Sequence, residues 1–168
     1  MGANATKNQI LLARIVVVII VAFLIAGGVT YGYSTDVRDR VWHDLLERHD
    51  ALFRFRFILQ PVMAAIAALR DGVEDARLGR TPYFWALISR PNERVERLAE
   101  GVISTARVLL LGLIMDTVYQ LIVLKTFYPV EADIIAIVLA LIPYLLLRGP
   151  ILRVVRWWRD RSSAEKRL

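Results

Sequence analysis

The sequence contains no cysteine, and this absence excludes disulfide bonds, thiolate metal sites and cysteine nucleophiles. It also lacks three motifs that mark enzyme classes: the H-E-x-x-H zinc motif, the Walker phosphate loop and the G-x-S-x-G nucleophile turn. No internal repeat, heptad series or low-complexity tract is visible. We therefore expect no enzymatic activity and no cofactor.

The chain is unusually rich in hydrophobic residues. Of its 168 residues 57% are hydrophobic and the mean hydropathy is +0.47, whereas soluble domains are usually about 45–50% apolar. This length leaves room for one domain, 1–168. The composition therefore predicts a single integral membrane domain.

The central apolar stretch covers residues 101–124, and an ionisable side chain, Asp116, lies near its middle. At about 1.5 Å per residue this stretch is long enough to cross a hydrocarbon core of roughly 30 Å. The first apolar run, residues 10–30, is expected to be a membrane anchor rather than a signal peptide, because it is longer than a typical signal-peptide core. The second apolar run, residues 51–69, contains Arg54, Arg56, Gln60 and Pro61. The last apolar run, residues 131–151, is interrupted by Pro143. The expected spans are residues 10–30, 51–69, 104–125 and 131–151, followed by a basic tail, 152–168.

Two segments outside the spans have a helical pattern. Residues 35–50 form an amphipathic helix by their periodicity. Residues 70–100 form a helical connector with six arginines and six acids, which we expect to be solvated. Within it Thr81 is predicted to cap a short interfacial helix over residues 83–88.

Charge predicts the topology. Seven Lys or Arg follow Leu147, six Arg lie in the connector, and the turn near Lys125 has one. The positive-inside rule then places the connector, the tail and the N-terminus in the cytoplasm, with four crossings. Three crossings, with the N-terminus outside, is the alternative.

Polar residues near the membrane centre are the first candidate site. If the second and third spans are antiparallel neighbours, residues of the second approach the depth of Asp116 on the third, and a buried network becomes feasible. Such a cluster either holds the bundle together or serves as an ion relay or polar substrate site. Its members are Arg56, Gln60, Asp116, Tyr119 and Gln120.

The amphipathic segment carries a second candidate. Asp39, His43 and Glu47, at i, i+4 and i+8, share one helix face and have ligand types suited to a divalent metal. Because every amphipathic helix needs a solvated face, and because neighbouring arginines offset the acids, we expect no metal there.

The tail is expected to contact lipid headgroups rather than nucleic acid, since it follows a span directly. Its candidate contacts are Arg153, Arg156, Trp157, Trp158 and Arg159.

At RFRFILQP, RDG and PYFWAL the chain resembles small bacterial integral membrane proteins of uncharacterised function. The resemblance implies a bacterial inner membrane and names no activity.

The expected fold is therefore all-α, a four-span membrane bundle with an amphipathic segment and a cytoplasmic helical connector. The expected function is that of an accessory or structural membrane subunit. It would act through helix packing and contacts with lipid, a protein partner or a second copy. The alternative is a small transporter or channel component built around Asp116.

Overall fold

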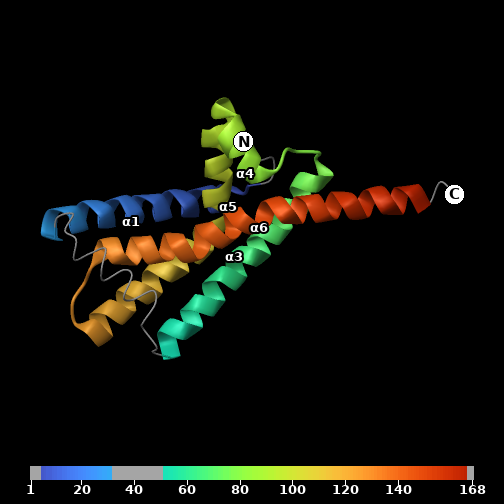
Figure 1. Ribbon diagram of the computed structural model, residues 1–168. Coiled ribbons are helices and arrows are strands. Elements are labelled where there is room, and N and C mark those ends of the chain that lie inside the picture. Colours follow the sequence, from blue (N-terminus) through green and yellow to red (C-terminus); the bar gives the residue numbers. More distant parts are fainter. Residues whose placement is uncertain (1–4, 32–50, 166–168) are drawn as a thin grey trace.

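The computed structural model describes residues 5–31 and 51–165, and every regular element in these two stretches is a helix (Figure 1). The α-helices are α1 (Lys7–Tyr31), α3 (Ala51–Arg77), α4 (Tyr83–Ser89), α5 (Arg94–Tyr119) and α6 (Pro129–Glu165). A 3-10 turn, η1 (Pro91–Glu93), precedes α5, and a π-helical turn, η2 (Gln120–Leu124), follows it.

Three helical segments are long and apolar enough to cross a membrane: α1, α5 with its flanking turns, and α6. These agree with the first, third and fourth predicted spans. Within the described residues α3 is not among them, and Arg54, Arg56 and Gln60 make its first half more polar than the three spans. Residues 5–31 and 51–165 are thus all-helical apart from their loops, with three helices of membrane-spanning length among them.

Contacts between helices give their directions. The turn around Lys125, which has a left-handed backbone (φ 53°), reverses the chain between α5 and α6. Phe127 in this turn packs edge-on against Phe23 of α1, with ring centroids 5.3 Å apart. The far end of α1 therefore lies at the turn. We call this the turn end of the bundle, and the end from which α6 projects the tail end.

Helix α3 runs parallel to α6 and packs more extensively against it than against any other element. Asp71 bonds Tyr144, and one turn later Asp75 bonds Arg148. Both partners advance by four residues toward the tail end, which two parallel helices require.

Small residues let the helices approach closely. A methyl group added at Gly112 would lie 1.8 Å from Gln60 Nε2 and 3.3 Å from Ala136 Cβ. The core around this point combines small and branched side chains from α1, α5 and α6, among them Ala13, Val16, Leu109, Leu113, Ala136 and Ala140. This is the small-residue packing that brings membrane helices into contact.

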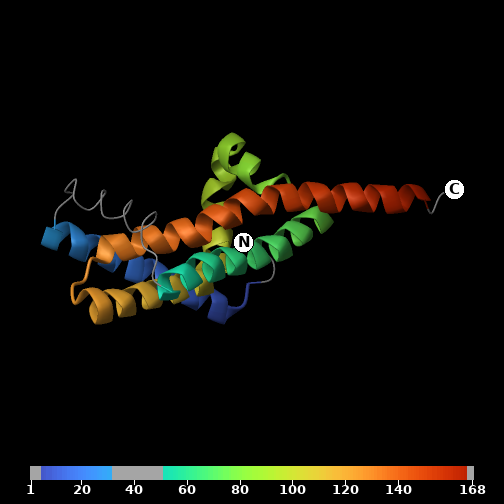
Figure 2. The ribbon, with the colours of Figure 1, turned by 60° about the horizontal axis from the view of Figure 1, so that its bottom comes forward.

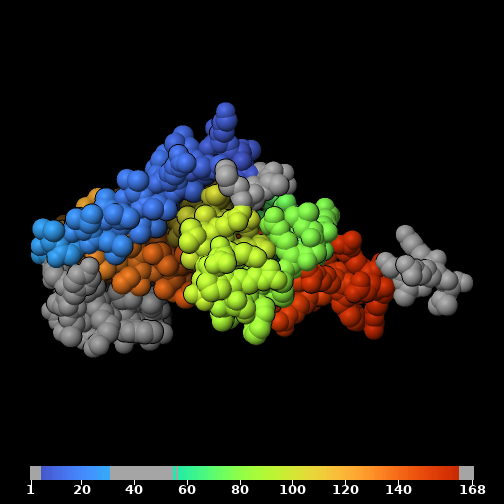
Figure 3. Space-filling model, turned by 90° about the horizontal axis from the view of Figure 1, so that it is seen from above, coloured from blue at the N-terminus to red at the C-terminus, as the bar shows by residue number. Residues whose placement is uncertain are grey.

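Helix α6 is the longest element, and at about 1.5 Å per residue its 37 residues extend about 55 Å. It continues through Pro143 and Pro150, so the expected interruption at Pro143 is wrong. Its first part packs among the other helices and its last part projects beyond them (Figure 2). Seen from above, α1 covers one face of the bundle, and the projecting part of α6 stands clear of it (Figure 3).

The connector differs from the sequence-based expectation. Helix α3 runs on to Arg77, and Asp75 and Arg97 are only 1% and 8% exposed, so a fully solvated connector is wrong. The short helix forms as predicted, over Tyr83–Ser89, but Thr81 does not cap it. Its N-cap is Pro82, which has no side-chain acceptor to offer the first turn.

Candidate functional site

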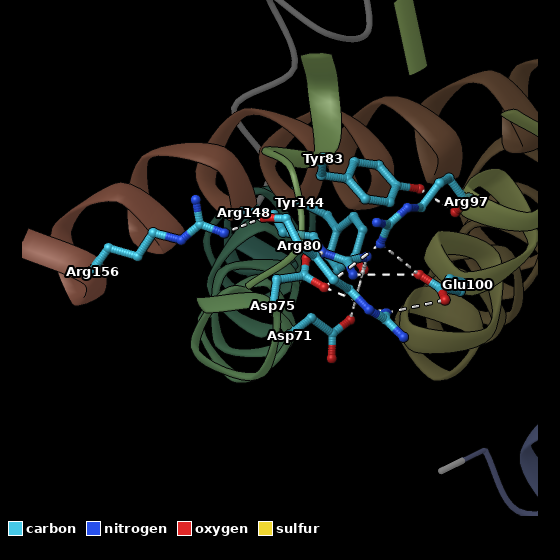
Figure 4. A network of polar contacts seen from close by, with 9 residues as sticks. All are labelled: Asp71, Asp75, Arg80, Tyr83, Arg97, Glu100, Tyr144, Arg148 and Arg156. Atoms are coloured by element: carbon cyan, nitrogen blue, oxygen red, sulfur yellow. Dashed lines mark hydrogen bonds and ion pairs between the residues drawn. The ribbon is translucent and has the colours of Figure 1, made fainter. Parts of the chain in front are cut away.

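A network of buried charges lies at the tail end of the bundle, where α3, α4, α5 and α6 meet (Figure 4). At its centre is Arg148 of α6, 3% exposed. Its Nε donates to Asp75 Oδ2 at 2.7 Å, and its Nη1 donates to the Tyr144 hydroxyl at 2.6 Å. Its Nη2 lies 3.5 Å from Glu100 Oε2. A buried guanidinium is tolerated only when charged and polar groups surround it, and here three elements supply them.

Two further arginines approach the same carboxylates. Arg80 Nη1 lies 3.3 Å from Glu100 Oε1 and 3.6 Å from Asp75 Oδ1. Arg97 Nη1 lies 3.3 Å from Glu100 Oε2 and 3.7 Å from Asp75 Oδ1. Asp75 Oδ1 has two cations within ion-pair distance but no hydrogen bond, because both nitrogens are too far away. Its compensation on that side is electrostatic only.

Two tyrosines enclose the Arg148 guanidinium, which lies 4.2 Å from the ring centre of Tyr83 and 5.6 Å from that of Tyr144. The rings meet edge to face at 5.9 Å. The Tyr144 hydroxyl donates to Asp71 Oδ2 at 2.6 Å, and the Tyr83 hydroxyl donates to the Arg97 carbonyl oxygen. Burial raises the pKa of Tyr83 from 10.0 to about 12, since burial disfavours the phenolate.

The chain beyond the network is held to α3 as well. Arg156 donates to the Arg80 carbonyl oxygen, and Arg159 Nη1 donates to the Ala76 carbonyl oxygen at 3.1 Å. Both arginines follow Arg148 by about two to three helical turns on α6. Their hydrogen bonds fasten the start of the projecting part of α6 to the end of α3 and to the loop after it.

A cavity of about 300 Å³ opens beside the network. One part of its wall is apolar and includes Leu12, Met63, Ile66 and Val108. The rest is polar and carries four arginines and four carboxylates. These are Arg70, Asp71, Glu74, Asp75, Arg80, Glu100, Arg107 and Arg148, with Gln9 and Ser104 beside them. A cavity whose wall combines charged and apolar side chains can accept an amphiphile.

Three members of the predicted central cluster, Gln60, Asp116 and Gln120, are fully buried. Asp116 and Gln120 are both fully buried, and Gln120 Nε2 donates to Asp116 Oδ2 at 2.8 Å. Gln120 Oε1 accepts the backbone N–H of Tyr128 at 2.6 Å. Gln120 thereby ties the turn back to α5. Tyr119, in the last turn of α5, is half-buried.

Gln60 is also fully buried, and it lies beside the middle of α5. Its Nε2 donates to the Val108 carbonyl oxygen at 3.3 Å and fills the space that Gly112 leaves open. Two turns of α5 separate Val108 from Asp116. Arg56 belongs to α3, but its side chain lies outside the described residues.

A carboxylate that the sequence reasoning passed over lies at the turn end. Asp133, in the second turn of α6, is 0% exposed, and neither of its oxygens has a hydrogen-bond partner within the described part of the chain. Glu131, two residues earlier, is 2% exposed. Buried carboxyl groups in a membrane-spanning helix are costly and mark functional sites more often than chance.

The tail candidates divide into two groups. Arg153, Trp157 and Trp158 are exposed, as a headgroup contact requires, and Arg161 stacks on the Trp157 ring at 3.9 Å. Arg156 and Arg159 instead bond the backbone of the α3 end. The metal candidates Asp39, His43 and Glu47 lie outside the described residues.

The sequence reasoning missed the charged network because it read residues 70–100 as surface. One signal was present: Asp71 and Asp75 are four apart, and so are Tyr144 and Arg148. Complementary pairs with equal spacing on two helices are what two parallel helices need in order to bond side by side.

Comparison of the chain with protein-family models, with curated proteins and with solved structures finds no match.

Proposed function

We propose that this protein is an accessory or structural subunit of a membrane, acting without enzymatic activity through helix packing and through contacts with lipid or another protein. The observation that carries the proposal is the form of α6, one helix that begins inside the bundle and projects from its tail end. Bonds from Arg148, Arg156 and Arg159 fasten it to α3 and to the loop that follows α3. The protein would hold a basic, aromatic helix at a set position beside the membrane.

The proposed topology has four crossings with both termini in the cytoplasm of a bacterium, in its inner membrane. The parallel directions of α3 and α6 support it, since a helix parallel to α6 runs from the turn end to the tail end as a second crossing should. The basic tail end would then face the cytoplasm. Anionic headgroups, rather than nucleic acid, are its expected nearest partners.

The test removes the projecting helix. A chain that ends at residue 152 keeps Arg148 and the rest of the network, so it should remain folded in the membrane. In blue-native electrophoresis of membranes solubilised in a mild detergent, we expect the full chain in a discrete larger assembly and the shortened chain outside it. Substituting only Trp157 and Trp158 with Ala, a control that keeps the helix length, should weaken the assembly without removing it. A full chain that migrates only as a single copy with bound detergent would contradict the proposal.

A second candidate function is a small transporter or channel component built around Asp116. It is favoured by the burial of Asp116 within α5 and by the unbonded carboxyl of Asp133 on the neighbouring α6. Carboxyl groups at membrane depth can carry protons or hold a cation. Purified protein in liposomes would be tested for flux of protons or of monovalent cations. Flux that Asp116→Asn or Asp133→Asn abolishes, with stability unchanged, would establish this function in place of the structural one.

A further inference from the structure

The cavity at the tail end lies at one particular depth in the bundle. On each of the four long helices the apolar run ends beside it: at Ile10 on α1, Leu69 on α3, Val108 on α5 and Leu147 on α6. The polar residues that adjoin these four positions all line the cavity, and they are Gln9, Arg70, Arg107 and Arg148. Where hydrocarbon segments end together, the lipid headgroup layer begins.

Two of the arginines on the wall have no protein partner. Arg148 and Arg80 are engaged by the carboxylates described above. Arg70 and Arg107 are exposed and form no hydrogen bond or ion pair within the described part of the chain. They reach the cavity from different helices, α3 and α5. A ligand with negative charge in the cavity would meet two guanidinium groups with free donors.

The four carboxylates on the wall are engaged elsewhere. Asp71 accepts from Tyr144, and Asp75 and Glu100 are paired with Arg148, Arg80 and Arg97. Glu74 has an interaction of its own as well. The wall balances in formal charge, four arginines against four carboxylates, but the guanidinium groups of Arg70 and Arg107 are the two cations on it that keep free donors.

We propose that this cavity binds the phosphate headgroup of an anionic phosphoglyceride, with Arg70 and Arg107 holding the phosphate and the apolar wall covering the first part of an acyl chain. A volume of about 300 Å³ is at the lower end of the range for small-molecule sites. It suits a glycerophosphate group whose chains continue into the surrounding membrane. The proposal does not depend on the subunit role proposed above, since the site is distinct from the exposed face of the projecting helix.

The test measures lipid binding to the purified, delipidated full chain with dioleoyl phosphatidylglycerol as the probe, by native mass spectrometry. The variant R70Q/R107Q should bind this lipid on the order of tenfold more weakly than the wild type. The matched control is R77Q/R153Q, which removes the same charge from two exposed arginines that do not line the cavity. The control should keep wild-type affinity. All three proteins should have the same melting temperature in detergent, because none of the four arginines has a hydrogen-bond or ion-pair partner among residues 5–31 and 51–165.

Three outcomes would overturn the proposal. One is an equal loss of affinity in R70Q/R107Q and R77Q/R153Q, which would assign binding to general surface charge. Another is equally tight binding of phosphatidylcholine to the wild type, which would show that the headgroup's net charge is not recognised. The third is competition by inorganic phosphate at the lipid's own concentration, which would make the cavity a site for free phosphate. Failure in any of these ways leaves the electrophoretic test of the projecting helix unaffected.

Discussion

Replacing Arg148 with Met tests whether the network holds the tail end together. The substitution keeps an apolar stem of similar length and removes the guanidinium. Asp75, 1% exposed, then loses its 2.7 Å bond, and Glu100 loses a cation at 3.5 Å. Removing one member of a buried ion pair typically costs about 3–5 kcal/mol. Arg80 and Arg97 remain within 3.7 Å of the Asp75 carboxylate, so we expect about 3 kcal/mol, the lower end of that range.

The measurement is equilibrium unfolding by a denaturing detergent, followed by circular dichroism. A double-mutant cycle with Asp75→Leu isolates the pairwise contribution, since the double variant lacks both the Arg148 guanidinium and its main acceptor. We expect the two single losses to exceed the double loss by about 1–3 kcal/mol. Arg153→Met, an exposed change on the same helix, is the control and should alter stability by less than about 0.5 kcal/mol. The reasoning is refuted if Arg148→Met costs under about 1 kcal/mol, or if the two single losses simply add.

Three other predictions test the topology, the packing and the buried phenol. Reporter fusions at the C-terminus should read cytoplasm and a fusion at Tyr128 should read outside; a cytoplasmic signal at Tyr128 would reject the four-crossing topology. Gly112→Ala should lower the free energy of unfolding in detergent by about 1–3 kcal/mol, because the added methyl group would lie 1.8 Å from Gln60 Nε2. Gly149→Ala is the control and should be neutral, since an added methyl group there has nothing within 4 Å. Equal effects of the two substitutions would contradict the close approach at Gly112. Because the pKa of Tyr83 is raised to about 12, its neutral phenol contributes fully to the stability of the fold below about pH 10, and this contribution is lost as the pH rises through about 12. The free energy of unfolding should fall by about 2–3 kcal/mol over this range, and Tyr83→Phe should remove the decline. Parallel stability curves for wild type and Tyr83→Phe between about pH 9 and 12 would contradict the assigned burial.

The helices and their order could be read from the sequence. Long apolar runs predict α1, α5 and α6, and Lys125 with its neighbours marks the reversal between the last two. The burial of Asp116, Gln120 and Gln60 also agrees with their pattern, since each lies on the side of its helix that faces other helices. Periodicity identifies such a face because it depends only on local geometry.

The candidate site could not be read in the same way. Asp75 and Arg148 are 73 residues apart, and nothing local to either one indicates the other. A charged stretch between apolar runs is usually solvated, and Asp75 departs from that rule only because α6 passes beside it. Periodicity gives the face of a helix but not the height at which it meets its neighbour. The hydrogen bond from Gln60 to the Val108 carbonyl oxygen, 48 residues away, could not be read from local pattern for the same reason.

The parallel pairing of α3 and α6 also bears on how the protein is made. The ribosome delivers α3 well before α6, and when Asp71 and Asp75 emerge, their partners on the last helix have not been synthesised. By its own composition α3 is the long described helix least able to remain among lipid chains. Arg80 and Arg97 follow soon after α3, but the hydrogen bonds of its two carboxylates are complete only after residue 148 has joined the chain. Completion of the last helix therefore completes the packing of the earlier one, and a chain released before Tyr144 would leave Asp71 and Asp75 without these hydrogen bonds.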